Sequence, residues 1–307
     1  MLARLLRLTY LVQLLTGMLL GTWGAVVLMH AWSGAALALV LGGGVGWVVA
    51  WQAVIVGFSV MKSRPAGPLW PCLQAFWSEF KAALLIFGLR QPWTKAKPVV
   101  LPPLSPPEPG TNALPVLLVH GFVCNHRVWD KAATALRRAG HTVLAIDLEP
   151  LFAPIDDYAA LVEQAVIELR AQTGVKQVVL VGHSMGGLAI RAWLRAHGST
   201  HAAKIITLGT PHQGTQAPQW LSTPNGTQMM WHSPWLSELA QCESPTVRTL
   251  MQLALTRHDN IVYPQRAQVL PDATVTEFSN IGHLAMCLDA EVIRWLVQQA
   301  GSAPSPH

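Results

Sequence analysis

The stretch QVVLVGHSMGG, residues 177–187, decides the fold. An apolar run rich in valine leads directly into GHSMG (182–186), and a segment with helical spacing of apolar residues follows. A sharp turn from a strand into a helix strains the backbone of the central serine, and glycines two residues before and after it relieve the crowding. The turn exposes Ser184 at a helix N-terminus, whose dipole favours negative charge. The motif therefore predicts that Ser184 is a nucleophile.

The same alternation of strand and helix extends on both sides of this motif. Short apolar runs that predict strands lie at 116–120, 142–147, 177–182, 204–209, Thr249–Leu255 and Thr274–Phe278. Segments that predict helices lie at Val128–Ala139, Asp157–Gln172, Met185–Ala196 and Leu284–Gln299. Elements of these lengths in this order predict an α/β fold with a mainly parallel sheet and helices on both faces.

A serine hydroxyl needs a base, and after a turn of this kind the partners follow in the order serine, acid, histidine. Of the 12 histidines, His283 alone comes directly after the last predicted strand and before the last predicted helix. The others lie too early, inside other motifs or at the end of the chain. His283 is therefore the predicted base.

The acid is expected in the loop after the preceding strand. Asp259, in RHDNIV (257–262), stands there and could accept the imidazole Nδ1–H. Asp272, in the turn VLPDAT, and Glu243 are the alternatives.

The oxyanion hole is predicted from HGF (120–122), which follows the first strand of this region. A backbone amide there and one from the residue after the nucleophile form the donor pair in such sites. The predicted donors are the amides of Phe122 and Met185. Because the sequence contains no cluster with metal-ligand spacing, we expect neither a metal nor an organic cofactor.

The N-terminal region is typical of a membrane segment. The chain of 307 residues is 51% apolar and only 12% charged, and no Asp, Glu, Lys or Arg stands between Arg7 and Lys62. One helical span needs about 20 apolar residues, so this run predicts two, at Thr9–Met29 and Ala35–Val60, joined by HAWSG (30–34). A cleaved signal peptide is the alternative, but its apolar region would be much shorter.

The positive charges predict the orientation. Arg4 and Arg7 precede the first span, and Lys62 and Arg64 follow the second, which places both ends of the hairpin in the cytoplasm. A further apolar stretch, 71–89, carries Glu79 and Lys81 at its middle, which favours an amphipathic helix lying in the membrane interface. If it crossed instead, the following domain would face the opposite side.

These patterns divide the chain into three parts. Residues 1–64 contain the two spans, and residues 65–114 contain the amphipathic helix and a proline-rich linker; the stretch from Lys97 to Pro115 inclusive has seven prolines. Residues 115–307 form the predicted catalytic domain. Within it, the segment 211–246 is too long for a simple connection and predicts a cap or lid; a small packed subdomain whose aromatic residues form a core is an equal alternative.

Charge and cysteine content exclude some function classes. The formal net charge is +5, but the basic residues form only small clusters beside apolar segments, so we expect no binding of nucleic acid. The four cysteines show no metal spacing. A disulfide between Cys242 and Cys287 is compatible with their positions, but buried thiols are favoured.

Together, HGF, GHSMGG, TLGTPHQGT, HDNIV and GHLAM resemble bacterial lipases and esterases of the α/β-hydrolase fold. The resemblance covers about 115–299 and does not reach the first hundred residues. It implies a Ser184–His283–Asp259 triad and carboxylic ester hydrolysis on lipids or other apolar esters. An acyltransferase with the same triad is the nearest alternative, and an inactive membrane-anchored interaction module is a more distant one. The uncharged hairpin and the positive charges beside it, in a chain that resembles bacterial proteins, give the expected location: a bacterial inner membrane, with two spans and a cytoplasmic catalytic domain.

Overall fold

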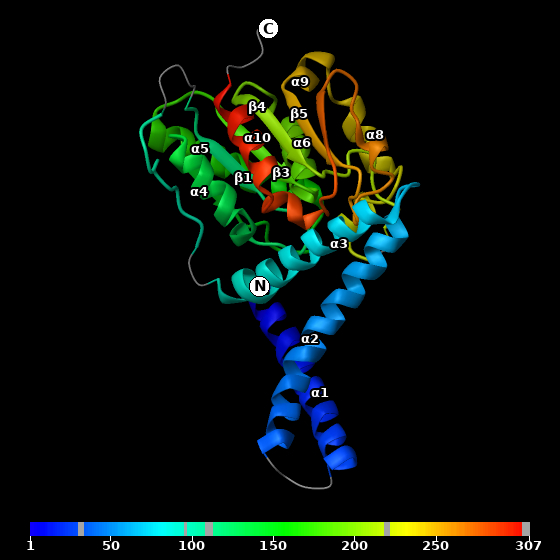
Figure 1. Ribbon diagram of the computed structural model, residues 1–307. Helices are drawn as coiled ribbons and strands as arrows, with labels where there is room; N and C mark the ends of the chain where they lie inside the picture. Colours follow the sequence, from blue (N-terminus) through cyan, green and yellow to red (C-terminus); the bar gives the residue numbers. More distant parts are fainter. Residues whose placement is uncertain (30–33, 95–96, 108–112, 218–221, 303–307) are drawn as a thin grey trace.

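The computed structural model describes residues 1–29, 34–94, 97–107, 113–217 and 222–302. An α/β domain lies at one end of the molecule, and a hairpin of two long helices projects from it (Figure 1). Most of the predicted turn at 30–34, and Trp220 of the predicted lid, fall outside the described residues.

The α/β domain is built on a six-stranded parallel sheet with the strand order β2-β1-β3-β4-β5-β6. The predicted strands are all present, within a few residues of their expected bounds. The strands are β1 (Val116–Val119), β2 (Val143–Ile146), β3 (Val178–His183), β4 (Ala202–Leu208), β5 (Met251–Thr256) and β6 (Thr274–Phe278). All residues of the central strands β1, β3, β4 and β5 are buried, as expected for a parallel sheet covered on both faces.

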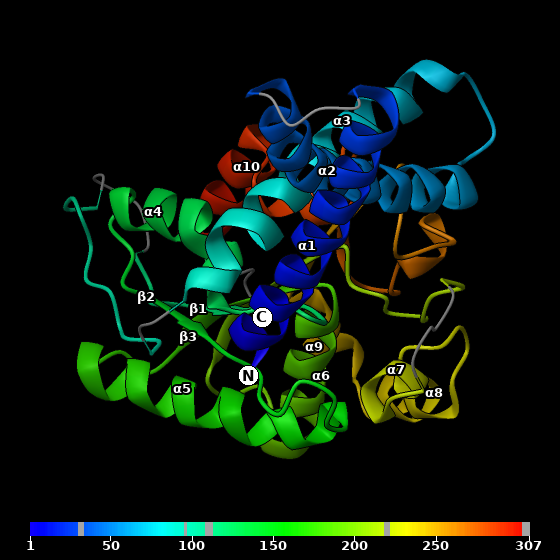
Figure 2. The same cartoon turned by 90° about the horizontal axis from the view of Figure 1, so that it is seen from below.

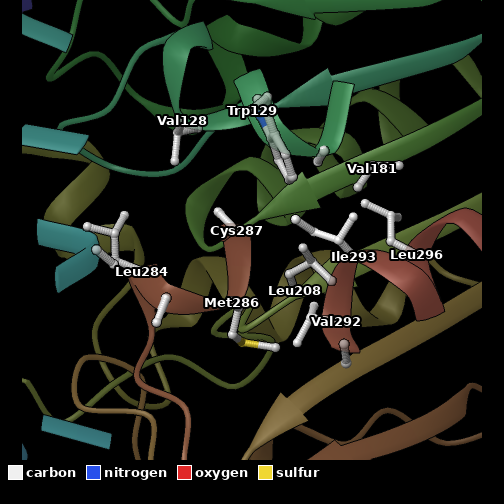
Figure 3. Packing of buried hydrophobic residues seen from close by; sticks show 14 of the residues in the cluster. Val128, Trp129, Val181, Leu208, Leu284, Met286, Cys287, Val292, Ile293 and Leu296 are labelled. Carbon is white, nitrogen blue, oxygen red and sulfur yellow. The ribbon is translucent and has the colours of Figure 1, made fainter. Parts of the chain in front are cut away.

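Helices cover both faces of the sheet. On one face, α4 (Asp130–Arg138) and α10 (Ala290–Gly301) pack in a core that includes Trp129 and Leu296 (Figure 3). On the other face, α5 (Tyr158–Thr173) and α6 (Met185–His197) form a second core. Because the six strands are parallel, their carboxyl ends all lie at the same end of the sheet.

The last predicted helix, 284–299, is in fact two elements. A short 3-10 turn, η6 (Leu284–Cys287), is followed by α10, and Asp289 separates them. The side chain of Asp289 accepts hydrogen bonds from the backbone N–H groups of Glu291 and Val292, which caps the start of α10.

The projecting hairpin consists of α1 (Leu2–Met29) and α2 (Gly34–Ser63). By length and composition these two helices, and a third at Leu69–Trp93, could cross a membrane. The hairpin helices cross at glycines: a Cβ at Gly43 would lie 2.7 Å from the carbonyl oxygen of Gly17. Small residues at such a crossing let two backbones approach closely.

After α2 the chain turns back along the α/β domain. The helix α3 (Leu69–Ala83) continues into a π-helical turn, η1 (Leu84–Arg90), and a 3-10 turn, η2 (Gln91–Trp93). The apolar side of α3 packs into the same core as α4 and α10, together with residues from the end of α2. Buried side chains of this region are Val56, Val60, Cys72, Phe80, Ala82, Ala83 and Ile86. The end of α2, α3 and the turn after it therefore share a hydrophobic core with the sheet.

The proline-rich segment runs along the outer strand of the sheet. The backbone of Leu101 exchanges two hydrogen bonds with that of Val143 in β2, with N···O distances of 2.8 and 3.0 Å. The N–H of Leu104 donates to the carbonyl oxygen of Arg137 at the end of α4. These bonds occupy part of an edge strand that would otherwise have free peptide groups.

The described part of the insertion between β4 and β5 contains three short helices, α7 (Pro224–Gln228), α8 (Pro234–Gln241) and α9 (Pro245–Thr249). Met229 and Leu236 are buried in the core on the α6 side of the sheet. The indole N–H of Trp235 donates to Asp156 at 2.8 Å. The described part of the insertion is thus packed onto the domain by both apolar and polar contacts.

We expect the close crossing of α1 and α2 to tolerate no large side chain. Gly43→Leu would place its Cβ against the backbone of Gly17 and push the helices apart, which typically costs about 1–3 kcal/mol. Gly46→Leu is the matched control, because a Cβ at Gly46 meets nothing within 4 Å. Thermal unfolding in detergent should show a lower Tm for Gly43→Leu only; equal Tm values would contradict the crossing.

Candidate active site

Ser184 lies between the end of β3 and the start of α6, with φ 53° and ψ −127°. A positive φ is rare for a residue with a side chain and marks local strain. The N–H of Ser184 donates to the carbonyl oxygen of Leu208 in β4, at 2.9 Å, which holds the strained residue against the neighbouring strand. The predicted strand–turn–helix setting of GHSMG is confirmed.

The glycines of this motif leave no room for larger residues. A Cβ at Gly182 would overlap the backbone of Gly187, and one at Gly186 would overlap the carbonyl oxygen of Val119 in β1. The turn therefore depends on glycine at both positions, for the reason that the sequence predicted.

Asp259 and His283 are brought together from the loops after β5 and β6. His283 Nδ1 lies 2.8 Å from Asp259 Oδ2, and both side chains are almost fully buried. The second carboxylate oxygen of Asp259 accepts the N–H groups of Ile261 and Val262, at 2.9 and 2.7 Å. These bonds hold the carboxylate so that its other oxygen, Oδ2, faces the imidazole. Nδ1 then carries the proton and donates to Oδ2, and Nε2 is left unprotonated.

His183 links the base to the nucleophile turn. Its ring centroid lies 4.6 Å from that of His283, and its Nε2–H donates to the backbone carbonyl oxygen of His283 at 3.1 Å. Because His183 immediately precedes Ser184, these contacts bring the loop that carries the predicted base beside the predicted nucleophile.

Two further residues shape the pair, and the sequence analysis did not identify either. Gly209, at the end of β4, has φ 55°, and a Cβ there would lie 3.0 Å from Asp259 Oδ2 and 3.1 Å from His283 Nδ1. The side-chain oxygen of Asn260 accepts the N–H of His283 at 3.0 Å. Both stand inside quoted motifs, TLGTPHQGT and HDNIV, but only their tertiary contacts show what they do.

The HGF segment lies against the nucleophile. A Cβ at Gly121 would lie 2.7 Å from that of Ser184. His120 Nε2 accepts the N–H of Leu148, so its Nδ1 carries the proton and donates to the carbonyl oxygen of Gly121 at 2.8 Å. In a trans peptide the next N–H, that of Phe122, points the opposite way from this carbonyl. His120 therefore orients one of the two predicted oxyanion donors.

The other predicted donor, Met185, begins α6 and is buried. Its sulfur lies 3.6 Å from the side-chain amide nitrogen of Asn225, in α7 of the insertion. The same nitrogen donates to the carbonyl oxygen of Leu151 at 2.9 Å. The insertion is thus in direct contact with the start of the helix that follows the nucleophile.

The alternative acids lie elsewhere. The side chain of Glu243 is 4% exposed and pairs with Arg191, with Oε1 and Nε 2.5 Å apart. Asp272 stands in an exposed turn with φ 67°. Cys242 is exposed and Cys287 is buried, and both thiols are free. Among the described residues, no three His, Cys, Asp or Glu side chains gather in a way that could hold a metal ion.

The region before the domain contacts three loops of this site. The amide nitrogen of Asn260 donates to Ser59 Oγ of α2 at 2.9 Å, and Gln91 Oε1 accepts the N–H of Asn125, in the loop after β1, at 2.6 Å. In the loop after β6, the N–H of Gly282 donates to Ser78 Oγ of α3. The hairpin end of the molecule therefore lies at the edge where the strands end, as Figures 1 and 2 show.

Burial and neighbouring charges set the protonation of the two histidines in opposite directions. Burial lowers the pKa of His183 well below its usual range, and the neighbouring His283 lowers it further, so His183 is neutral. For His283, burial again favours the neutral form, but the charge and hydrogen bond of Asp259 and the charge of Glu79 outweigh it and raise the pKa.

Comparison with known proteins agrees with this architecture. Residues 115–259 match the family model described as alpha/beta hydrolase fold. The mature Bacillus licheniformis lipase BlEst2 superposes with a TM-score of 0.56 at 19% identity, covering 65% of this chain and 97% of that one. Aspergillus fumigatus lipase B gives a TM-score of 0.55 at 18% identity, covering 67% and 57%. The chain has the α/β-hydrolase fold.

Among curated proteins, this chain is similar to two triacylglycerol lipases. Those of Pseudarthrobacter phenanthrenivorans and Burkholderia plantarii are each 32% identical over 111 residues, or 33% of this chain. The match spans about a third of the length of these relatives, 34% and 30%. Over these 111 residues the chain is therefore similar to triacylglycerol lipases.

The contact between Asp259 and His283 predicts a pH effect. Asp259→Asn removes the charge that raises the pKa of His283, so the acidic limb of kcat/KM should move to lower pH. The imidazole would also lose its fixed tautomer, and kcat should fall by a factor on the order of 10³–10⁴. The measurement is ester hydrolysis against pH.

Asp272→Asn is the matched control for this experiment, because it removes the same charge in an exposed turn where asparagine tolerates the positive φ. A large loss in Asp272→Asn with none in Asp259→Asn would contradict the assignment of the acid.

Proposed function

We propose that this protein is a membrane-bound serine hydrolase that cleaves carboxylic esters with apolar acyl groups. The observation that carries the proposal is the buried Asp259–His283 pair, packed against His183, which directly precedes a serine with φ 53° at a strand–helix turn. This combination is what nucleophilic catalysis by serine requires: a nucleophile, a base and a group that orients the base. The lipase-like matches over the catalytic domain support the same chemistry.

In the proposed reaction, His283 accepts the proton of Ser184 as its oxygen attacks the ester carbonyl carbon. The backbone N–H groups of Phe122 and Met185 bind the oxyanion that forms. His283 then gives its proton to the departing alkoxide, and the alcohol leaves an acyl-enzyme. Water attacks this intermediate with His283 again as base, and the carboxylic acid and free Ser184 result.

The proposed substrate class follows from where the site lies. Helices α1 and α2 expose large apolar side chains such as Leu8, Leu19 and Trp23, which water would not favour and lipid would. The loops of the site lie on the same side of the sheet as these helices. An ester whose acyl chain lies in the bilayer can therefore reach the site without crossing much water.

For the membrane topology we propose two spans, α1 and α2, with α3 in the interface. Although α3 and the turns after it are long and apolar enough to cross, much of α3 is buried against the α/β domain, including the charged Glu79. A helix held in this way packs against the α/β domain and does not cross the bilayer core. With Arg4 and Arg7 before the first span, the catalytic domain then lies in the cytoplasm of a bacterial cell.

The decisive test of the chemistry is hydrolysis of p-nitrophenyl esters from acetate to palmitate, with fluorophosphonate labelling alongside. We expect the wild type to hydrolyse and label, with kcat/KM rising for the longer chains, and Ser184→Ala to do neither. Activity on acetate alone would exclude the lipid substrate. A folded but silent and unlabelled wild type would exclude the hydrolase, and transfer of the acyl group to an added alcohol in preference to water would favour an acyltransferase.

The native cysteines allow a test of the topology. Cys242 is exposed, whereas Cys72, Cys124 and Cys287 are buried. A membrane-impermeant maleimide should label Cys242 only after cells are lysed, and Cys242→Ser should abolish the labelling. Labelling of Cys242 in intact spheroplasts would place the catalytic domain on the outside.

A further inference from the structure

Glu79 is a charged residue on the apolar helix α3, and it points into the protein. Its side chain is only 4% exposed. A buried carboxylate is costly unless hydrogen bonds stabilise it. Glu79 Oε1 accepts the N–H of Leu284 at 3.1 Å, and Oε2 accepts the N–H of Ala285 at 2.9 Å. Both oxygens therefore bind the backbone that directly follows His283.

This backbone is held at four consecutive peptide groups. The N–H of Gly282 donates to Ser78 Oγ and that of His283 to Asn260 Oδ1, and the next two donate to Glu79. Three of these four hydrogen bonds are thus accepted by side chains of α3. The approach is close: a Cβ at Gly282 would lie 2.6 Å from the Cβ of Glu79.

The segment after His283 is also anchored in the core beyond these bonds. Leu284, Met286 and Cys287 are buried among side chains of the sheet and of α10 (Figure 3). Phe80, one residue after Glu79, belongs to the same core. The backbone that carries His283 therefore rests between the core and α3, and it cannot shift without breaking bonds to Glu79.

We propose that Glu79 is a positioning residue for His283: the membrane-proximal helix α3 fixes the place of the general base and supplies a second negative charge near it. This inference rests on the proposed function, in which His283 is the base. Asp259 orients the ring directly through Nδ1, and Glu79 acts on the same residue through its backbone. In the reaction, the charge of Glu79 favours the imidazolium that forms when His283 takes the proton of Ser184.

The charges around His283 make this testable by pH. The ionisable groups that face it are Asp259, Glu79 and His183, and burial keeps His183 neutral. The thiols of Cys124 and Cys287 lie near Glu79, and burial raises the pKa of Cys124 to about 12 and that of Cys287 well above its usual range, so both are uncharged. Burial raises the pKa of Glu79 itself, whereas the charge of His283 and the two backbone N–H groups lower it. In their ionised forms, Asp259 and Glu79 are the two negative charges that raise the pKa of His283.

The experiment compares Glu79→Gln, Glu79→Asp and Ser78→Ala in the full-length protein in detergent. Glu79→Gln keeps the shape but loses the charge and one of the two acceptors. We expect kcat of Glu79→Gln to fall between about tenfold and a hundredfold, as for a small misplacement of a catalytic group. KM should stay nearly unchanged, because Glu79 is proposed to act through His283 and not on the substrate. The acidic limb of kcat/KM should move to lower pH. Glu79→Asp should restore the limb and part of kcat.

Ser78→Ala separates the hold on the backbone from the charge. It removes one bond to Gly282 without changing any charge, so kcat should fall by a smaller factor and the acidic limb should stay in place. Lys81→Gln, an exposed residue of the same helix, is the control expected to leave both unchanged.

Wild-type kcat and an unshifted limb in Glu79→Gln would overturn the inference. If Glu79→Gln does not fold, Ser78→Ala decides, because an unchanged kcat there would overturn the hold that α3 is proposed to exert. Fluorophosphonate labelling of the wild type distinguishes this outcome from failure of the proposed function. A wild type that neither labels nor hydrolyses contradicts the hydrolase itself, whereas an active wild type with an equally active Glu79→Gln contradicts only the role of Glu79.

Discussion

The loops after β1, β5 and β6 pack so closely at one edge of the sheet that water cannot reach many of their peptide groups. Each buried N–H without a partner would cost on the order of 1–3 kcal/mol, so side chains must supply the acceptors. Asp259 binds two such groups, Asn260 binds one and Glu79 binds two. The positions of the proposed acid and base follow from this requirement, because the groups that satisfy the loops also carry or hold the catalytic side chains.

Part of these acceptors comes from outside the residues that match the α/β-hydrolase family model. Ser59, Ser78, Glu79 and Gln91 all lie before residue 100, while the family match begins at residue 115. The apolar side of α3 also completes the core on the α4 and α10 face. The region before residue 100 is therefore a structural part of the α/β domain, and it places the end of the sheet that carries the proposed site beside the two projecting helices.

This arrangement gives the proposed base two carboxylates with separate tasks. Asp259 meets the imidazole itself, at 2.8 Å, whereas Glu79 meets the backbone beyond it. Both charges favour a protonated His283, and burial opposes them. The neighbouring His183 is neutral because burial lowers its pKa, so it can pack against His283 without repelling the imidazolium. Because the two carboxylates outweigh burial, the pKa of His283 is raised and this buried histidine can accept a proton.

Local sequence determined much of this protein. Short apolar runs predicted the central strands β1, β3, β4 and β5, because buried parallel strands need continuous apolar residues. The strained turn at Ser184 was predictable because only glycine fits two residues before and after it. Two uncharged stretches predicted α1 and α2, since length and polarity alone decide which helices a bilayer can hold.

The tertiary structure decided what distant segments do to one another. Asp259, Asp272 and Glu243 were all candidates for the acid, and only the fold places Asp259 beside His283 and pairs Glu243 with Arg191. Glu79 stands 205 residues from Leu284, and in the sequence its charge indicated only that α3 does not cross the membrane. A hydrogen bond over such a separation leaves no local pattern, because it depends on packing between elements and not on the spacing of residues within one.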